Sequence, residues 1–460
     1  MNFSEAKQYL LSLGHETLAM KFGLDGIRRL LRELGNPHED FYKIQIAGTN
    51  GKGSTAVMID SIARSSGIRT GLYTSPHLVS LTERIRIDGE NLSPGAFAHH
   101  ATLTRRAAEH IADTHNSIAT FFEQVTAIAL LAFRDARIDL AILETGLGGR
   151  LDAVTATRAA LVGITSIALD HQEYLGTTLT EIAREKAAVI RPGTKAVIAP
   201  QAPEARDAIT KHLAAHTTTP NIVPHYVIPG NAHVKHVDAH GRVTVDITTK
   251  GCTHPDLFLN LPGRHQIPNA QVAVELAEIL RDEHFHITDE AIRAGLAASH
   301  HAGRLEWRTS PNNEPSLLFD GAHNAAGAHA LANYLGEFVH LPLTIIFGAM
   351  RDKDLNDIAA SLFPLAHRLI LTQPDNPRAA PVDLLRETAL KHKPASHINH
   401  CPHVKEALQL AQDLTAHDGV ICITGSLYLI GEAKDALNLQ VIFNRDHEYI
   451  RQTKTRNHRK

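Results

Sequence analysis

The segment Lys43-Ile-Gln-Ile-Ala-Gly-Thr-Asn-Gly-Lys-Gly-Ser-Thr55 carries the strongest structural signal in this chain. Residues 43–47 alternate in polarity, which predicts a strand, and glycines then mark a loop. From Ser54 onward the spacing is helical up to a stop at Gly67, and the positions expected to face inward are Val57, Ile59 and Ile62. In such a strand–loop–helix unit, backbone N–H groups, the helix N-terminus and the charge of Lys52 can surround a phosphate chain.

The glycine loop departs from the standard P-loop. Only Thr49-Asn50 separate Gly48 from Gly51, where the standard motif has a longer spacer. Gly53 stands where a Ser or Thr hydroxyl usually binds magnesium. Either the loop is an ordinary glycine-rich turn, or it binds phosphate and the metal ligands come from other strands. The second hypothesis requires candidate ligands downstream, and the chain has them.

The composition favours a cytoplasmic protein of two domains. A chain of 460 residues exceeds what one hydrophobic core usually holds. The net charge of −3 gives no general reason to expect a nucleic acid or an anionic membrane as partner. No signal peptide or membrane-spanning run is recognisable. The three cysteines, Cys252, Cys401 and Cys422, are far apart, which argues against a disulfide framework or a zinc site.

Strand-like and helix-like segments alternate along most of the chain, which predicts a parallel α/β sheet with right-handed crossovers. Residues just beyond the C-terminal ends of such strands share one edge of the sheet. Four polar segments follow apolar strands in this way: 48–55, 74–77, 144–152 and 170–171. From 195 to 261 the pattern is weaker and more β-like, and alternation restarts after His300-His301-Ala302-Gly303. We therefore expect a domain over 1–299, a linker at 300–303, and a smaller α/β domain with a basic tail over 304–460.

The polar motifs, taken together, carry a family resemblance. They are Gly48-Thr-Asn-Gly-Lys-Gly-Ser54, Ser75-Pro-His77, Glu144-Thr-Gly-Leu-Gly-Gly-Arg-Leu-Asp152, Asp170-His171 with Tyr174-Leu-Gly176, Glu185-Lys-Ala187, Asp320-Gly-Ala-His-Asn324 and Gly348-Ala-Met-Arg-Asp-Lys-Asp354. From about Phe22 to Gly431 the sequence resembles the folylpolyglutamate synthase/dihydrofolate synthase family, relatives of the muramyl-peptide ligases. The resemblance implies a P-loop ATPase-type domain followed by a Rossmann-like glutamate-ligase domain.

The activity that the resemblance implies is an ATP- and Mg²⁺-dependent amide ligase. A folate or pteroate carboxylate would attack the γ-phosphate of ATP, and the amine of L-glutamate would then displace phosphate from the acyl phosphate. We therefore expect ATP, L-glutamate and either tetrahydrofolate or dihydropteroate as substrates. We also expect two Mg²⁺ ions and a monomer that binds neither nucleic acid nor membrane.

The resemblance also assigns the metal ligands. Ser75 and Glu144 match ligands of the ion between the β- and γ-phosphates, and His171 matches a ligand of a second ion. Oxygen ligands suit Mg²⁺. On the residues alone, Glu144 could be a surface acid and His171 a structural histidine. Lys186 matches a lysine that the family carries as a carbamate, the alternative being a solvated lysine on a helix surface, with Glu181 and Glu185 nearby.

Three further sets of positions match family sites. The positions that match ATP contacts are Thr49, Asn50, Gly51, Lys52, Gly53, Ser54, Thr55, Asn269, Arg304 and Asp320. The positions that match the lining of the pterin pocket are Phe22, Phe122, Glu123, Leu151, Asp152 and Ala153. The expected catalytic residues are Lys52, Lys186 and His323. Two alternatives remain: Asp320 could form an ordinary Asp-Gly turn, and Phe121 and Phe122 could be core residues.

The sequence departs from the family pattern at three places. Asp152-Ala-Val-Thr155 replaces the usual Asp-Ala-Thr-Asn, His323-Asn-Ala325 replaces His-Asn-Pro, and Lys21 stands where some bifunctional members have an acid. These departures bear on which of the two reactions dominates. The competing hypotheses are a Mur-type ligase for a non-folate carboxylate and an ATP-binding switch or motor. Gly53 and the short N-terminal segment argue against the first, and the metal-ligand cluster argues against the second.

Overall fold

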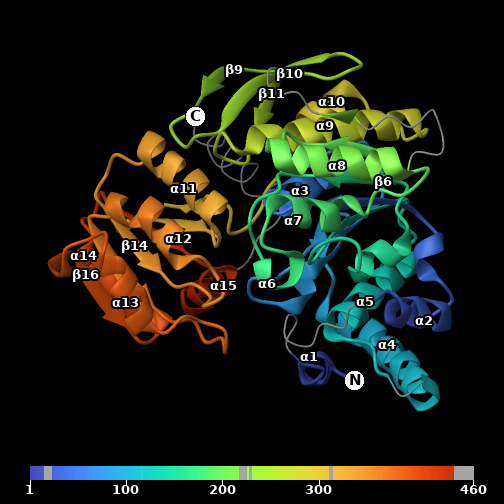
Figure 1. The fold of residues 1–460 in the computed structure, drawn as a ribbon, viewed down its shortest axis with the longest axis horizontal. Coiled ribbons are helices and arrows are strands. Elements are labelled where there is room, and N and C mark those ends of the chain that lie inside the picture. Colours follow the sequence, from blue (N-terminus) through green and yellow to red (C-terminus); the bar gives the residue numbers. More distant parts are fainter. Residues whose placement is uncertain (15–22, 116, 217–224, 227–230, 310–313, 440–460) are drawn as a thin grey trace, which may run out of the picture.

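The computed structural model describes residues 1–14, 23–115, 117–216, 225–226, 231–309 and 314–439. Phe22 and Lys21 lie outside the described residues. Two sheet-centred bodies stand side by side, with the later residues forming the smaller body (Figure 1). A mixed α/β fold with parallel sheets was expected, and the structure confirms it. The predicted domain division at 300–303 stays a prediction.

The larger body contains an eight-stranded sheet of order β4-β3-β2-β5-β1-β6-β7-β8. Its strands are β1 (Tyr42–Ala47), β2 (Thr70–Tyr73), β3 (Ile85–Ile87), β4 (Glu90–Asn91), β5 (Leu140–Glu144), β6 (Leu161–Ile164), β7 (Lys195–Ile198) and β8 (His225–Tyr226). All neighbouring strands from β2 to β8 run parallel, and β3 and β4 add an antiparallel edge. In the pairing of β1 with β5, Ile46 lies opposite Glu144. The glycine loop and the segment after β5 therefore share one edge of the sheet, as predicted.

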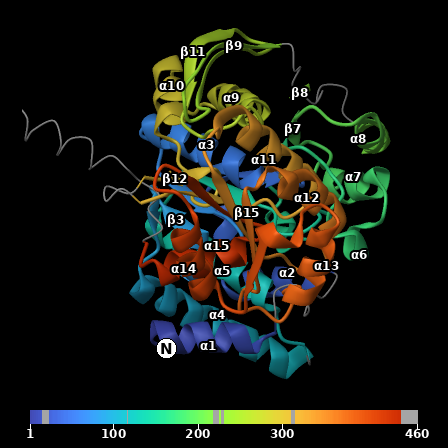
Figure 2. The same ribbon diagram turned by 90° about the vertical axis from the view of Figure 1, so that its left-hand side faces the viewer.

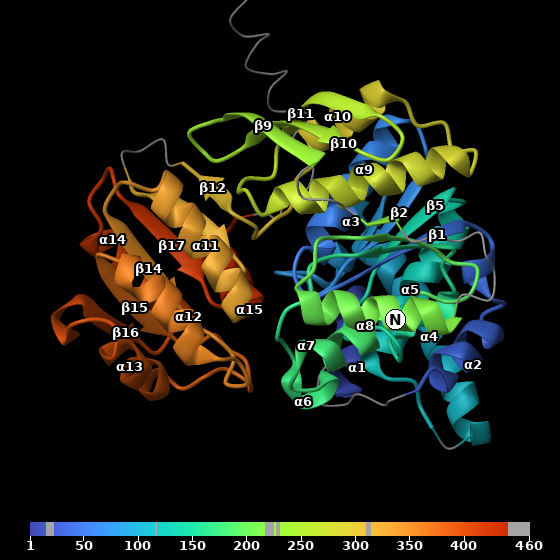
Figure 3. The same cartoon turned by 45° about the horizontal axis from the view of Figure 1, so that its top comes forward.

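Helices cover both faces of this sheet (Figure 3). They are α1 (Phe3–Ser12), α2 (Asp25–Glu33), α3 (Lys52–Ser65), α4 (Pro94–His115), α5 (Phe121–Ala136), α6 (Gln172–Leu175), α7 (Leu179–Ala187), α8 (Pro203–His216), α9 (Gln266–Asp282) and α10 (Asp289–Ala298). Along β5, Leu140 and Ile142 pack with α3 and α9, whereas Ala141 and Leu143 pack with α5. This alternation buries every residue of the strand, as expected of a parallel sheet covered on both faces. Among the described helices, none combines the length and the apolar character needed to cross a membrane.

A separate antiparallel sheet covers α9 and α10. Its strands are β9 (Ala232–Val237), β10 (Val243–Thr248) and β11 (Thr253–Leu259), in the order β11-β10-β9. Val243, Val245 and Ile247 alternate along β10 and join the core that contains α9. The hairpin of β10 and β11 therefore packs on the helix rather than extending the main sheet (Figure 3).

The smaller body holds a six-stranded sheet of order β12-β13-β17-β14-β15-β16. Its elements are β12 (Glu306–Arg308), β13 (Ser316–Asp320), α11 (Ala325–Phe338), β14 (Leu343–Phe347), α12 (Leu355–Leu362), β15 (Arg368–Thr372), α13 (Val382–Leu390), β16 (Ile398–Cys401), α14 (Val404–Leu414), β17 (Val420–Thr424) and α15 (Leu427–Ala436). Only β12 is antiparallel to its neighbour. Helices α11, α12 and α13 pack on one face, and α14 and α15 on the other (Figure 2).

Helix α8 and strand β16 are among the elements that the sequence analysis did not predict. Helix α8 lies inside the region that was predicted to be β-like, and strand β16 was not anticipated. The apolar face of α8 is built from Ala205, Ala208 and Ile209, so its helical pattern consists mostly of small residues. Such a face gives a weak periodic signal although it packs well.

Candidate functional site

A cavity of about 640 Å³ lies at the edge of the main sheet where the glycine loop begins. Its wall contains nearly every predicted nucleotide, metal and catalytic residue: Thr49, Asn50, Gly51, Lys52, Gly53, Ser54, Ser75, Glu144, His171, Lys186, Asn269, Arg304, Asp320 and His323. Thr55 is the exception, because it lies buried inside α3 and its hydroxyl has no hydrogen-bond partner among the described residues. Residues that are far apart in sequence thus meet around one space.

Close packing explains the two glycines that flank Lys52. Gly51 is the N-cap residue just before α3, with a φ of 88°, and a Cβ there would collide with the amide oxygen of Asn269. A Cβ at Gly53 would lie 2.6 Å from Cε1 of His301 and 3.5 Å from Oε2 of Glu144. A Ser or Thr cannot occupy position 53 without displacing the His301 ring. Neighbours from other elements therefore account for the missing P-loop hydroxyl.

Lys52 points into the cavity from the first turn of α3. Its Nζ donates a hydrogen bond to the backbone oxygen of Thr49, at 3.0 Å. Burial lowers the pKa of Lys52, while the charges of Glu144 and Asp170 act in the opposite direction. The amine is held within its own loop by a single backbone oxygen that a phosphate oxygen could replace.

Glu144 ends β5 and is buried, with 5% of its surface exposed. Its Oε2 accepts a hydrogen bond from the backbone N–H of Ser75, at 3.0 Å. Burial raises the pKa of Glu144, and the nearby charge of Lys52 opposes that effect. The alternative of a surface acid is therefore wrong. Glu144, which ends β5, and Ser75, which follows the neighbouring strand β2, both line the cavity, and their role toward a metal ion stays a prediction.

His171 follows Asp170 and is the N-cap residue just before α6, in a left-handed backbone conformation with a φ of 50°. Burial is the main reason why its pKa falls to about 3, and the charge of Asp170 only partly offsets it. The imidazole is therefore neutral at physiological pH, which leaves a ring nitrogen able to bind a metal ion. The same neutral ring would equally suit a structural histidine, so the ligand role stays a prediction.

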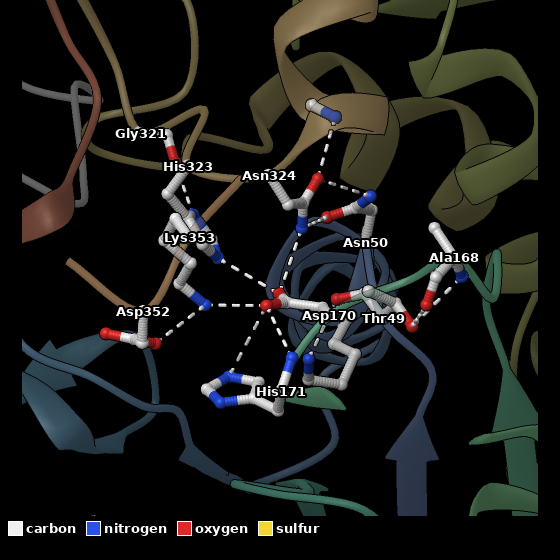
Figure 4. A network of polar contacts seen from close by, with 12 residues as sticks. Thr49, Asn50, Ala168, Asp170, His171, Gly321, His323, Asn324, Asp352 and Lys353 are labelled. Carbon is white, nitrogen blue, oxygen red and sulfur yellow. Dashed lines mark hydrogen bonds and ion pairs between the residues drawn. The ribbon is translucent and has the colours of Figure 1, made fainter. Parts of the chain in front are cut away.

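Asp170 is the centre of a polar network that joins the two bodies (Figure 4). Lys353 donates to its Oδ1 at 2.6 Å, Asn324 donates to its Oδ2 at 3.0 Å, and Nε2 of His323 lies 3.5 Å from the same oxygen. Asn324 and Asn50 also exchange amide hydrogen bonds of 3.0 and 3.2 Å. Although burial acts to raise the pKa of Asp170, its contacts with His323 and the nearby positive charges hold it well below the usual range.

This network contains residues to which the sequence analysis gave no role. Asn324 and Lys353 belong to motifs that were quoted for the resemblance, but nothing in the local sequence linked either one to Asp170. Asn324 and Lys353 lie 154 and 183 positions from Asp170 in the sequence. The signal that could have found them is the placement of polar residues directly after β13 and β14, the edge where sheets of this kind bind ligands.

Lys186 lies on α7 with 4% of its surface exposed. Its Nζ donates to the backbone oxygen of Gly48, at 2.6 Å. Burial, followed by the charge of Lys52, lowers its pKa to about 7. The alternative of a solvated surface lysine is therefore wrong. With this pKa, the Lys186 amine is uncharged in a large fraction of the molecules near neutral pH. The uncharged amine is the form that acts as a nucleophile.

A second cavity of about 250 Å³ adjoins the first, and the two share Ser75, His171 and His323 in their walls. The predicted pterin residues in its wall are Phe122, Glu123, Leu151, Asp152 and Ala153. Phe121 also reaches this wall but is buried in the core, whereas Phe122 is half-buried and packs against Gly146. Phe121 therefore belongs mainly to the core, whereas Phe122 exposes part of its ring to the cavity.

The carboxylates of Asp152 and Glu123 also stabilise the backbone. Asp152 accepts from the N–H groups of Leu147 and Val154, each at 2.9 Å. Burial raises the pKa of Asp152 to about 6, and these hydrogen bonds oppose the rise. Glu123 accepts from the N–H of Thr120 at 2.7 Å and so caps α5. A ligand in this cavity would meet carboxylates that are already held in place.

Asp320 fits both of the interpretations that the sequence left open. Its Oδ1 accepts from the N–H of Ala322 within the Asp-Gly turn, and its Oδ2 accepts from the N–H of Leu305. The same side chain lines the larger cavity beside Arg304, whose Nη1 donates to the backbone oxygen of Gly321. The turn therefore presents the carboxylate to the cavity, and its role toward a ribose stays a prediction.

Comparison with known proteins identifies two family domains. Residues 46–277 match the Mur ligase middle domain, and residues 303–427 match the Mur ligase glutamate ligase domain. A Haloferax volcanii protein named probable bifunctional folylpolyglutamate synthase/dihydropteroate synthase is 34% identical over 96% of this chain. The chain spans about half of that relative, 51% of its length.

Two further proteins match along nearly their whole length. The Bacillus subtilis protein named dihydrofolate synthase/folylpolyglutamate synthase is 31% identical over 92% of this chain and 97% of its own length. A solved structure of Mycobacterium tuberculosis folylpolyglutamate synthase complexed with ADP superposes with a TM-score of 0.86 at 30% identity. That match covers 95% of this chain and 98% of the other.

Proposed function

The chain belongs to the folylpolyglutamate synthase/dihydrofolate synthase family of Mur-type ligases, and we propose that it uses ATP to join L-glutamate to folates and also to dihydropteroate. The observation that carries this proposal is the pair of adjoining cavities. The larger one is lined by a phosphate loop, buried acids and a lysine of lowered pKa, and the smaller one has the aromatic wall that a flat pterin ring requires.

The proposed reaction begins in the larger cavity. Lys52 and the N–H groups at the start of α3 would hold the β- and γ-phosphates, and Asn269, Arg304 and Asp320 would hold the remainder of ATP. The folate carboxylate would attack the γ-phosphorus, and ADP would leave. The amine of glutamate would then attack the acyl carbon and release phosphate. Bringing these groups together in one enclosed site supplies much of the rate enhancement.

The donor set around the phosphate loop fits Mg²⁺. Ser75 offers a hydroxyl, Glu144 a buried carboxylate and His171 a neutral imidazole on the same wall. When bound, Mg²⁺ would neutralise charge on the phosphates of ATP. Glu144 would hold the ion nearest the reacting phosphate, while His171 would serve a second ion. The hydrogen bond from the N–H of Ser75 fixes the orientation of the Glu144 carboxylate.

We also propose that Lys186 is carbamylated in the active enzyme. The neutral amine would attack CO₂, giving a carbamate anion and releasing one proton. The lowered pKa and the buried position support this, because the reacting form is present near pH 7 and solvent hydrolysis is restricted. The anion would supply a further oxygen ligand at the edge of the cavity.

The experiment that tests the proposed function is product analysis with dihydropteroate and tetrahydrofolate side by side. Each is incubated with ATP, Mg²⁺ and glutamate, and ADP release and the glutamylated product are measured together. Glutamate-dependent ADP release with both substrates is expected. Product from tetrahydrofolate alone would leave only the folylpolyglutamate synthase activity, and no product from either would overturn the proposal.

Replacing the two metal-ligand candidates should have different consequences. In His171→Ala we expect the Mg²⁺ concentration for half-maximal rate to rise at least about tenfold, or ~1.4 kcal/mol, with partial rescue by added Mg²⁺. In Glu144→Ala we expect hardly any rescue, because this carboxylate serves the reacting phosphate. Rates are measured across a Mg²⁺ titration. Defects that do not depend on Mg²⁺ in both variants would contradict the assignment.

Asp152 should matter more for dihydropteroate than for tetrahydrofolate. Dihydropteroate is shorter, so its carboxylate reaches the phosphate only if its ring binds deep beside Asp152. We expect Asp152→Ala to cost the dihydropteroate reaction roughly 1.5–3 kcal/mol more, the range for a hydrogen bond to a charged group. The comparison uses kcat/KM for both substrates.

The backbone contacts of Asp152 require a matched variant. Asp152→Ala also removes the acceptor for Leu147 and Val154, so the glycine-rich loop could shift. Leu147 and Val154 donate to different oxygens of Asp152, so Asp152→Asn loses the charge and keeps only one of the two acceptors, whereas Asp152→Ala loses both. A larger defect in Asp152→Ala than in Asp152→Asn would show how much of the effect comes from the loop. Because burial raises the pKa of Asp152 to about 6, protonation below that pH should lower the dihydropteroate rate more than the tetrahydrofolate rate. Equal losses for both substrates would assign Asp152 to the shared machinery.

A further inference from the structure

The turn between β10 and β11 brings three metal-ligating side chains together, well away from both cavities. Cys252 lies in the turn, His254 follows in β11, and Glu278 reaches up from α9. The Cys252 Sγ lies 3.4 Å from Nε2 of His254 and 3.2 Å from Oε1 of Glu278. The His254 and Glu278 atoms are 2.8 Å apart. Three different ligand types thus converge on one point from two elements.

Neighbouring groups hold these ligands in place. His254 is 2% exposed, and its Nδ1 lies 3.8 Å from a carboxylate oxygen of Asp289. Asp289 is in turn held by Arg281, at 2.7 Å. Thr249 donates to Glu278 at 2.8 Å and accepts from the N–H of Cys252 at 3.1 Å, which shapes the turn. A carboxylate near the far nitrogen of a histidine commonly supports a metal-bound imidazole, and Asp289 stands on that side of the ring, beyond hydrogen-bond distance.

We propose that Cys252, His254 and Glu278 bind a divalent transition-metal ion of the Zn²⁺ type, separate from the ligase site. The thiolate of Cys252 distinguishes this set from the predicted Mg²⁺ ligands, because a soft thiolate beside an imidazole and a carboxylate suits Zn²⁺ and is a poor ligand for the hard Mg²⁺ ion. Metal–ligand bonds of about 2.0–2.3 Å place tetrahedral ligands roughly 3.5 Å apart, so the contacts of Cys252 need to open by only a few tenths of an ångström and the 2.8 Å contact between His254 and Glu278 by about 0.7 Å. Cys252 is exposed, which leaves the fourth position to water.

The competing explanation is a hydrogen-bond cluster without an ion. The side chains of Cys252, His254 and Thr249 all reach the same oxygen of Glu278, and three donors on one carboxylate oxygen would be stable by themselves. Binding would replace the contacts of Cys252 and His254 by bonds to the ion, and the thiol proton would pass to solvent. Since both arrangements use the same residues, only a measurement of metal binding distinguishes them.

An ion at this point would fasten the hairpin tip to α9. The first turn of α9 carries Asn269, whose amide oxygen adjoins Gly51 of the phosphate loop. The site would therefore support the element that forms part of the nucleotide cavity without contacting a substrate. It follows that an ion bound to the folded chain should raise its thermal stability.

The test is Co²⁺ binding to the full chain after removal of metal with a chelator. A thiolate-to-cobalt charge-transfer band is expected at one ion per chain, and added Zn²⁺ should abolish it. The predicted Mg²⁺ ligands include no cysteine, so Co²⁺ bound there would not produce this band. Cys252→Ser should abolish the band and weaken Zn²⁺ binding at least tenfold, while ligase activity with Mg²⁺ stays unchanged.

Cys401→Ser is the matched control, because it removes another thiol far from the cluster and should keep the band. Zn²⁺ should raise the melting temperature of the unmutated chain and of Cys401→Ser, but not of Cys252→Ser. Cys252 is exposed, so its replacement should leave the fold intact, whereas replacing the buried His254 carries a greater risk of misfolding. Absence of the thiolate band in the unmutated chain, or its persistence in Cys252→Ser, would overturn the proposal.

Discussion

Lys52→Ala is expected to lower kcat/KM by roughly 10²–10³-fold or more, the cost of removing one positioned group that stabilises developing charge. The Nζ of Lys52 lines the larger cavity and has one described hydrogen bond, to the backbone oxygen of Thr49. In the proposed reaction this amine contacts the transferred phosphate directly. Its removal should therefore weaken ATP use without opening the hydrophobic core.

The measurement for Lys52→Ala combines steady-state kinetics with a thermal melt. The matched control is Lys43→Ala, which removes a lysine from the opposite end of the strand that leads into the loop. Lys43 donates to the backbone oxygens of His38 and Phe41 and lies outside the cavity wall. We expect near-normal turnover in the control and an unchanged fold in both variants. Near-normal turnover in Lys52→Ala would show that the loop does not serve the phosphate.

Lys186→Ala should be inactive, and a short carboxylic acid such as acetate should restore part of the rate by standing in for the carbamate. The buried amine makes its hydrogen bond to Gly48, so the lost side chain leaves space beside the phosphate loop. Lys211→Ala on α8 is the control, since that lysine is exposed and distant from the cavity. A fully active Lys186→Ala variant would contradict the carbamate proposal.

The carbamate also predicts a pH dependence with a definite sign. The pKa of Lys186 is lowered to about 7, so the amine is mostly neutral above that pH and mostly protonated below it. Protonation removes the form that reacts with CO₂, so activity should decline as the pH falls through 7 and should respond to added bicarbonate. Carbon-13 NMR after exposure to labelled CO₂ should show a carbamate signal that is missing from Lys186→Ala. An unchanged spectrum in the unmutated chain would exclude the modification.

The sequence by itself determined the fold class and the edge of the sheet at which the site forms. Strand and helix periodicities are local properties, so β1 and α3 could be predicted without knowing their neighbours. Polar residues after consecutive parallel strands had to meet on one edge, and Ser75, Glu144 and His171 do line one cavity. Helix α8 was not predicted, because its buried face consists mostly of alanines, which give only a weak periodic signal.

Tertiary structure alone decided what surrounds each residue, because burial and contact distances depend on elements that are remote in sequence. A side chain at Gly53 would collide with the His301 ring, a neighbour 248 positions away that the sequence does not reveal. The pKa of Lys186 falls to about 7 because the fold buries its amine against Gly48. Asp170 meets Lys353 across 183 positions of sequence, and Cys252, which the sequence left isolated, meets Glu278 across 26. Folding of the chain brings such partners into contact. Hydrophobic periodicity describes only local structure, so it cannot predict which remote residues meet.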